Sequence, residues 1–222
     1  MNLFHFISDF FNDSAHWQGY DGIPTRVAEH IQYTLQALGI AALIALPVGL
    51  VTGHYGRGGN ALAFIAVAGR ALPTFGLLVL MTLLVGFGMV NVMTPLVILA
   101  VPPILVTTYE AMRSVDPSPV DAARGMGMDE WGVLFQVEVP AALPLILSGL
   151  RSAAIQIVST ATIAAYVALG GLGRYIVDGL YQRNYEKVVG GATLVAGLAL
   201  VTLAVFWAAG RFAVSPGVRR RA

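Results

Sequence analysis

The stretch Val115–Pro140, VDPSPVDAARGMGMDEWGVLFQVEVP, decides how the rest of the chain folds. It is the longest charge-bearing segment between strongly apolar ones, and residues 71–109 before it contain no Asp, Glu, Lys or Arg. Charged side chains are costly inside a lipid bilayer. We therefore expect this segment to lie in water between two membrane-length runs, where it contacts another molecule.

The composition indicates an all-α integral membrane protein. Of the 222 residues, 57% are hydrophobic and 11% are charged, and the mean hydropathy is +0.74. Soluble domains carry about 25% charged residues. Because several apolar runs reach the roughly 20 residues that cross a bilayer as a helix, we expect a helical multi-pass chain in contact with membrane lipid.

Several function classes are excluded by what the sequence lacks. The net charge is +1 and Lys187 is the only lysine, so we expect no nucleic-acid partner. The absence of cysteine excludes disulfides and thiolate chemistry. The four histidines are scattered without metal-ligand spacing, so the chain is expected to hold no metal and no cofactor.

Apolar runs predict about five spans, with a short N-terminal segment (1–30), a transmembrane part (31–210) that includes a loop (113–144), and a basic tail (211–222). The expected spans are Ile31–Thr52, Ala61–Phe87, Pro95–Met112, Leu145–Leu169 and Val188–Gly210. Arg70 and Pro73 interrupt the second span, which is then one broken helix or two half-helices. Residues 1–11 fit a short amphipathic segment at the membrane surface or a frayed terminus, and residues 170–187 are expected to form a loop.

The orientation follows from the excess of basic residues on the cytoplasmic side of membrane proteins. Arg211 and the arginines at 219–221 predict a cytoplasmic C-terminus, and five spans then leave the acidic N-terminus outside. By the same count the Val115–Pro140 segment is cytoplasmic.

Within this segment two helical stretches are expected. Ser118 or Pro119 starts a helix over Val120–Met128, with Asp121 in the first turn, where the helix dipole favours an anion. Residues 129–139 form an amphipathic stretch that ends at Pro140 and restarts beyond Pro144. A short helix with a small-residue flank suits a groove on another protein, and an ordinary amphipathic connector fits the same pattern.

The spacing of fixed residues resembles the EAA loop of bacterial ATP-binding-cassette importer permeases. That pattern is Glu-Ala-Ala, three residues, Gly, nine residues, Ile-x-Leu-Pro. This sequence has Asp121-Ala122-Ala123, then Gly127, then Val137-x-Val139-Pro140 at the same separations, with conservative departures at Asp121, Val137 and Val139. The resemblance extends over about residues 31–210.

The resemblance implies a type I importer permease of the methionine-importer-like type, with a core of about five helices. Its loop would be a coupling helix docked on a cytoplasmic ATPase dimer, whose ATP cycle drives alternating access. A second permease copy or a paralogue and an extracytoplasmic substrate-binding protein would complete the transporter. The implied docking residues are Asp121, Ala122, Ala123, Arg124, Gly125, Met126, Gly127 and Pro140.

Catalysis is not expected in this chain. A phosphate-binding loop needs Gly before its Lys, whereas Lys187 follows Glu186, so ATP and Mg would be bound by the partner ATPase. A membrane-embedded enzyme would need a convergent set of Ser with His or of paired acids. His30 and His54 lie at opposite ends of the first span, and no acid lies within spans two, four or five. A passive channel fits the composition, and only the loop pattern argues against it.

The amino-acid sequences of further stretches are most similar to those of osmoprotectant permeases, which implies glycine betaine, choline or carnitine as substrate. These stretches are residues 29–34 with 46–50, residues 70–74 and residues 170–173, and the last two are shared with methionine importers, so a methionine or other amino-acid permease is the alternative. Pathway candidates are the polar residues Gln156, Ser159, Thr160 and Thr162, which also suit helix–helix contacts. Arg70 beside Pro73 either serves the pathway or caps the broken helix.

Overall fold

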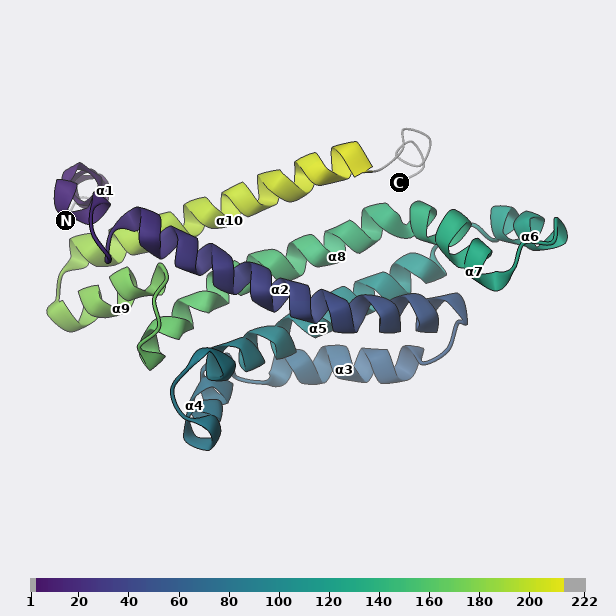
Figure 1. Ribbon diagram of the computed structural model, residues 1–222, viewed down its shortest axis with the longest axis horizontal. Coiled ribbons are helices and arrows are strands. Elements are labelled where there is room, and N and C mark those ends of the chain that lie inside the picture. The colour runs from purple at the N-terminus through teal and green to yellow at the C-terminus, as the bar shows by residue number, and fades with distance from the viewer. Residues whose placement is uncertain (1–2, 214–222) are drawn as a thin grey trace.

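The computed structural model describes residues 3–213, apart from the side chain of Arg70 (Figure 1). Over these residues the chain is helical, with no strand. In chain order the helices are α1 (Leu3–Asn12), η1 (Ser14–Trp17), α2 (Ile23–His54), α3 (Gly59–Ala71), α4 (Thr74–Val85), α5 (Met89–Arg113), α6 (Pro117–Gly125), α7 (Glu130–Gly132), η2 (Val133–Glu138), α8 (Val139–Thr160), η3 (Ala161–Val167), α9 (Gly173–Gln182) and α10 (Tyr185–Ala213).

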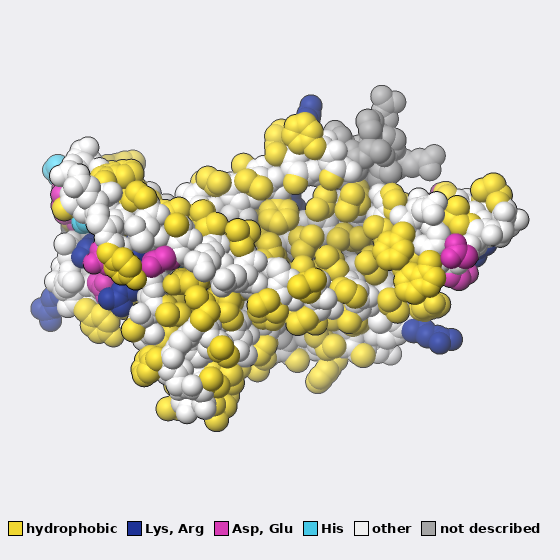
Figure 2. Space-filling model, viewed as in Figure 1, with side chains coloured by type: hydrophobic (Ala, Val, Ile, Leu, Met, Phe, Trp, Pro, Cys, Tyr) yellow, Lys and Arg dark blue, Asp and Glu magenta, His cyan; other side chains and the backbone are white. Residues whose placement is uncertain are grey.

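Four helical stretches are long and apolar enough to cross a membrane, and the number is five if the bent pair of α3 and α4 counts as one span. The four are α2, α5, the run from Glu130 to Val167, and α10, which lie lengthwise in the molecule (Figure 1). Hydrophobic side chains cover the middle of the viewed face, and most charged ones gather at its two ends (Figure 2). The expected all-α membrane fold is confirmed.

The second span is two helices rather than one. α3 and α4 meet at 84°, and Pro73 caps the start of α4 with an extended backbone (φ −71°, ψ 114°). Proline has no N–H with which to continue the hydrogen-bond ladder of α3. Of the two expected forms, a broken helix or two half-helices, the structure has the half-helices.

A ladder of small residues lets α2 and α5 approach closely. Ala37, Ala41 and Ala45 are fully buried, and Gly49 and Gly53 continue the same four-residue spacing toward the end of α2. A Cβ placed on Gly49 would lie 2.8 Å from the Thr108 side chain, and one on Gly53 would lie 2.5 Å from that of Met112. Lipid provides no hydrophobic drive between helices, so this close packing holds the pair together.

At the opposite end of α2, the expected loop over residues 170–187 contains the helix α9. α9 is amphipathic: Tyr175 and Val177 are buried, and Arg174 pairs with Asp178 one turn later at 3.0 Å. The Tyr175 hydroxyl donates to the Asp21 carbonyl at 2.7 Å. The sequence prediction of a loop was wrong here, because the glycines and charged residues of this stretch outweigh the few apolar residues of the buried helix face.

The N-terminal segment is also ordered as a helix, so the frayed alternative is wrong. α1 lies across the end of α10 (Figure 1), with Phe10 fully buried. The ring of Phe10 occupies the space above Gly190, where an added Cβ would come within 2.2 Å of it. The glycine therefore forms the seat for this aromatic ring.

Proline does not interrupt the helix at 140 and 144, contrary to the sequence prediction. The chain is continuously helical from α7 through α8, because η2 is a π-helical turn just before Pro140. In this turn Val139 donates to the Leu134 carbonyl, five residues back. The helix therefore continues through Pro140, which follows the π-helical turn, and through Pro144, which lies inside α8.

Candidate functional site

The helix α6, inside the Val115–Pro140 segment, begins earlier than expected. It starts at Pro117, and the Asp116 side chain caps it by accepting a hydrogen bond from the Ser118 N–H at 2.9 Å. Proline at the first helical position loses nothing, because its missing N–H would have had no partner in the helix. The capping role of Asp116 therefore replaces the predicted start at Ser118 or Pro119.

The two faces of α6 differ. Val120 and Ala123 are buried against Val133 of η2, so one predicted docking residue, Ala123, faces the protein. The opposite face is exposed and carries Asp121 and Ala122, with Arg124, Gly125, Met126 and Gly127 following on the exposed surface. Pro140 is exposed at the start of α8. The structure thus brings the predicted docking residues, except Ala123 and Pro140, onto one solvent-facing helix end.

A glycine turn terminates α6. Met128 donates to the Ala123 carbonyl at 3.1 Å and Gly127 donates to the Arg124 carbonyl at 3.0 Å. Gly127 has φ +86°, the left-handed conformation that this pair of hydrogen bonds requires and that other residues adopt at a cost. Met126, 80% exposed, is thereby presented at the tip.

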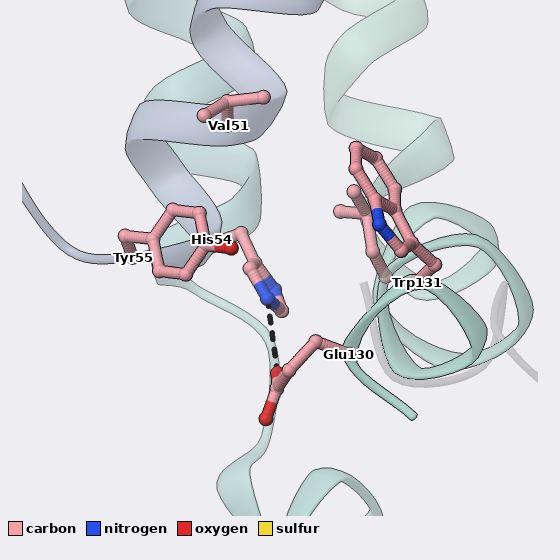
Figure 3. Close-up of a pocket in the computed structure, with 6 residues that line it drawn as sticks. Val51, His54, Tyr55, Glu130 and Trp131 are labelled. Carbon is pink, nitrogen blue, oxygen red and sulfur yellow. Dashed lines mark ion pairs between the residues drawn. The ribbon is translucent and has the colours of Figure 1, made fainter. Parts of the chain in front are cut away.

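A chain of charged side chains connects α6 to the end of the first span. Arg124 donates two hydrogen bonds to Glu130, from Nε at 3.1 Å and from Nη2 at 3.0 Å. Glu130 Oε2 lies 3.1 Å from His54 Nε2 (Figure 3). On the other side of the ring, His54 Nδ1 lies 2.5 Å from Glu138 Oε2. The hydrogen bonds that Arg124 donates to Glu130 raise the pKa of the Arg124 guanidinium.

Sequence reasoning missed this network. His54 lies far from Glu130 and Glu138 along the chain, and a lone histidine at the end of an apolar run carries no local signal. Only the packing of α2 beside the α7–η2 segment brings the three side chains together.

A pocket of about 250 Å³ opens beside the network. Val51 and His54 of α2, with Tyr55 directly after it, line one side, and Glu130, Trp131 and Leu134 line the other (Figure 3). Trp131 stacks on Phe135 with their ring centroids 5.9 Å apart. The described residues contain no cluster of His, Asp or Glu that would hold a metal ion.

The pathway candidates lie at the other end of the fourth span. Gln156 and Ser159 are exposed on α8, whereas Thr160 and Thr162 are half-buried near the change from α8 to η3. The Thr162 hydroxyl donates to the Ser159 carbonyl at 2.9 Å, which is a contact within its own helix rather than between helices.

The break in the second span lies near the same place. Phe75, two residues after Pro73, contacts Tyr166 of η3, with ring centroids 5.3 Å apart. The start of α4 therefore lies beside the end of the fourth span. Arg70 belongs to α3, and its side chain is outside the described part of the structure.

Comparison with known proteins assigns the family. Residues 45–220 match the family described as binding-protein-dependent transport system inner membrane component. The choline transport system permease protein OpuBB of Bacillus subtilis is 33% identical over 195 residues, covering 88% of this chain and 90% of the relative. The glycine betaine/carnitine/choline transport system permease protein OpuCB of the same organism is 31% identical, covering 79% and 81%.

Solved structures show the same fold. An inward-facing MetNI methionine ABC transporter matches with a TM-score of 0.73 and 22% identity, covering 85% of this chain and 94% of the solved one. An amino acid ABC transporter solved with histidines matches with a TM-score of 0.68 and 19% identity, covering 84% and 92%. The chain therefore belongs to the inner-membrane components of binding-protein-dependent transport systems, as a multi-pass permease subunit of an ATP-binding-cassette importer with the type I fold.

Proposed function

We propose that this permease passes an osmoprotectant such as glycine betaine, choline or carnitine into the cytoplasm by ATP-driven alternating access. The substrate class is supported by the relatives, which are named as permeases for these quaternary amines. A methionine or other amino-acid substrate is the alternative. ATP and Mg would be bound by a separate ATPase dimer, and the permease itself would catalyse no reaction.

The observation that carries the coupling role is the exposed face of α6. The helix is capped at both ends, seated on η2 through Val120 and Ala123, and joined to two membrane-length helices. Its free face presents Asp121, Ala122 and Met126 to solvent. A helix supported on one side and free on the other is suited to a groove of a partner protein. We assign that groove to the ATPase, which makes this end of the molecule cytoplasmic, the N-terminus outside and the C-terminus inside.

A second permease copy or a paralogue is supported by a polar stripe on α8. Ser152, Gln156 and Ser159 follow one another at spacings of four and three residues and are all exposed. Such side chains gain nothing from lipid and usually face another helix or a wet pathway. The stripe would therefore face the second permease across the pathway, with the binding protein docking at the end formed by α1 and α9.

The test is ATP hydrolysis by the complete transporter in lipid nanodiscs, with its ATPase and substrate-binding protein. We expect glycine betaine or choline to stimulate hydrolysis, and Asp121→Arg to reduce the stimulation by about tenfold or more, because a like charge in an interface costs several kcal/mol. Asp121→Glu is the matched control, since it keeps a negative charge at the same exposed position.

Stimulation by methionine alone would replace the substrate class and keep the coupling role. Full stimulation in an assembled Asp121→Arg transporter would contradict the docking of α6.

A further inference from the structure

His54 is held between two carboxylates. Its Nδ1 lies 2.5 Å from Glu138 and its Nε2 lies 3.1 Å from Glu130, and the ring is only 3% exposed. An ionised carboxylate only accepts hydrogen bonds, and a neutral imidazole donates from one nitrogen only. Both contacts are hydrogen bonds at the same time only if both ring nitrogens carry protons. The geometry therefore fits an imidazolium.

The charges around the ring balance in that state. Along the network the signs alternate from Arg124 through Glu130 and His54 to Glu138, and they sum to zero only with His54 protonated. Three further titratable or charged groups surround this set. The Tyr55 ring touches His54 edge-on, Arg113 of α5 lies against Gly56, and Asp121 acts on Arg124.

The network joins four elements across the base of the molecule. His54 ends α2, Glu138 belongs to η2, Glu130 begins α7, and Arg124 lies in the last turn of α6. The helix α6 also makes apolar contacts with η2. Its link to the first span runs through the ion pairs of Arg124, Glu130 and His54. His54 therefore links the position of α6 to the end of α2.

We propose that His54 is a positioning residue for α6: as an imidazolium it clamps Glu138 and Glu130, and through Glu130 and Arg124 it ties the exposed helix to the first span. This rests on the proposed coupling function of α6.

The charge state is tested first on the full-length chain in nanodiscs by ¹⁵N-histidine NMR. At pH 7 we expect one residue, identified by its absence in His54→Gln, to have two protonated ring nitrogens. His5→Gln is the control, because His5 also faces a carboxylate, Asp9 at 3.6 Å, but is exposed. An unprotonated ring nitrogen on His54 at pH 7 would overturn the proposal.

The clamp is tested next by amide hydrogen exchange over residues 116–132, corrected for the intrinsic effect of pH. His54→Gln should speed exchange there by about tenfold, the scale of one charge-assisted hydrogen bond, and His5→Gln should leave it unchanged. Glu130→Gln, at a half-exposed position, should act in the same direction if His54→Gln does not fold.

ATP hydrolysis then separates the clamp from the proposed function. If the native transporter is stimulated by its binding protein, His54→Gln should lower that stimulation without loss of assembly, and equal stimulation would overturn the positioning role. If the native transporter shows no stimulation, the proposed function fails, and the NMR and exchange results still decide whether the clamp exists.

Discussion

The closest approach of α2 to α5 gives a sharp prediction at Gly53. A Cβ at this position would lie 2.5 Å from Met112 Cβ and 3.2 Å from the Tyr109 carbonyl oxygen. Carbon atoms pack at about 3.5–4.0 Å, so Gly53→Ala forces the helices apart by about 1 Å. Neither obstacle is the end of a flexible side chain. Overpacking of this kind costs about 1–3 kcal/mol, and we expect the variant to be less stable by that amount.

Gly39→Ala is the matched control, because it lies on the same helix with no atom within 4 Å of the added Cβ. Alanine in a helix interior is favoured over glycine by about 0.5–1 kcal/mol, so this variant should be as stable as the native chain or more so. Thermal unfolding in detergent, followed by tryptophan fluorescence, should separate the two by about 2–4 °C per kcal/mol. Equal melting temperatures would refute the close-packing argument, since the two changes are chemically identical.

Three further predictions concern the two ends of the molecule. Gly127→Ala, at φ +86°, should cost about 1–2 kcal/mol in the turn after α6 and lower binding-protein-stimulated ATP hydrolysis, whereas Gly125→Ala, in the last turn of α6 with open space around it, should carry no such cost in stability. Gly190→Ala should expose α1 to proteolysis by removing its aromatic seat, and Gly197→Ala, unobstructed on the same helix, should leave α1 protected. Burial raises the pKa of Tyr175 to about 12 from its usual 10, so the folded state binds the phenol proton more tightly than the unfolded state. The contribution of Tyr175 to the free energy of unfolding is therefore complete below pH 10 and is lost between about pH 10 and 12. In Tyr175→Phe, the free energy of unfolding should not show this loss when the pH is raised.

Apolar length made the membrane spans predictable. A run such as the one from residue 31 to 52 signals a helix through composition alone, because the bilayer leaves the backbone no other way to satisfy its hydrogen bonds. The ends were less predictable. α2 extends eight residues beyond the start of the expected span, from Ile31 back to Ile23, with Pro24 in its first turn. Arg26 in this added part is paired with Asp21 and Glu29.

Proline was the least reliable signal. Pro73 does break a helix, as expected, whereas Pro140 does not. The difference lies in the neighbouring turn: η2 shifts its hydrogen bonds by one residue and leaves room for the ring of Pro140. Such a local rearrangement depends on how η2 packs on α6 and on the first span, so a rule applied to single residues could not anticipate it.

The segment that carries the functional inference was read correctly in its spacing and incompletely in its contacts. Fixed positions such as Gly127 are visible in a sequence because their backbone requirement is local. The ion network of Arg124 and Glu130 is not visible in the sequence, because it is completed by His54, a histidine from the first span. The small residues at Gly49 and Gly53 bring α5 against the same end of α2 that carries His54. Close packing thus fixes the end of α2, and a fixed end is what an ion network needs if it is to hold α6 in place rather than move with it.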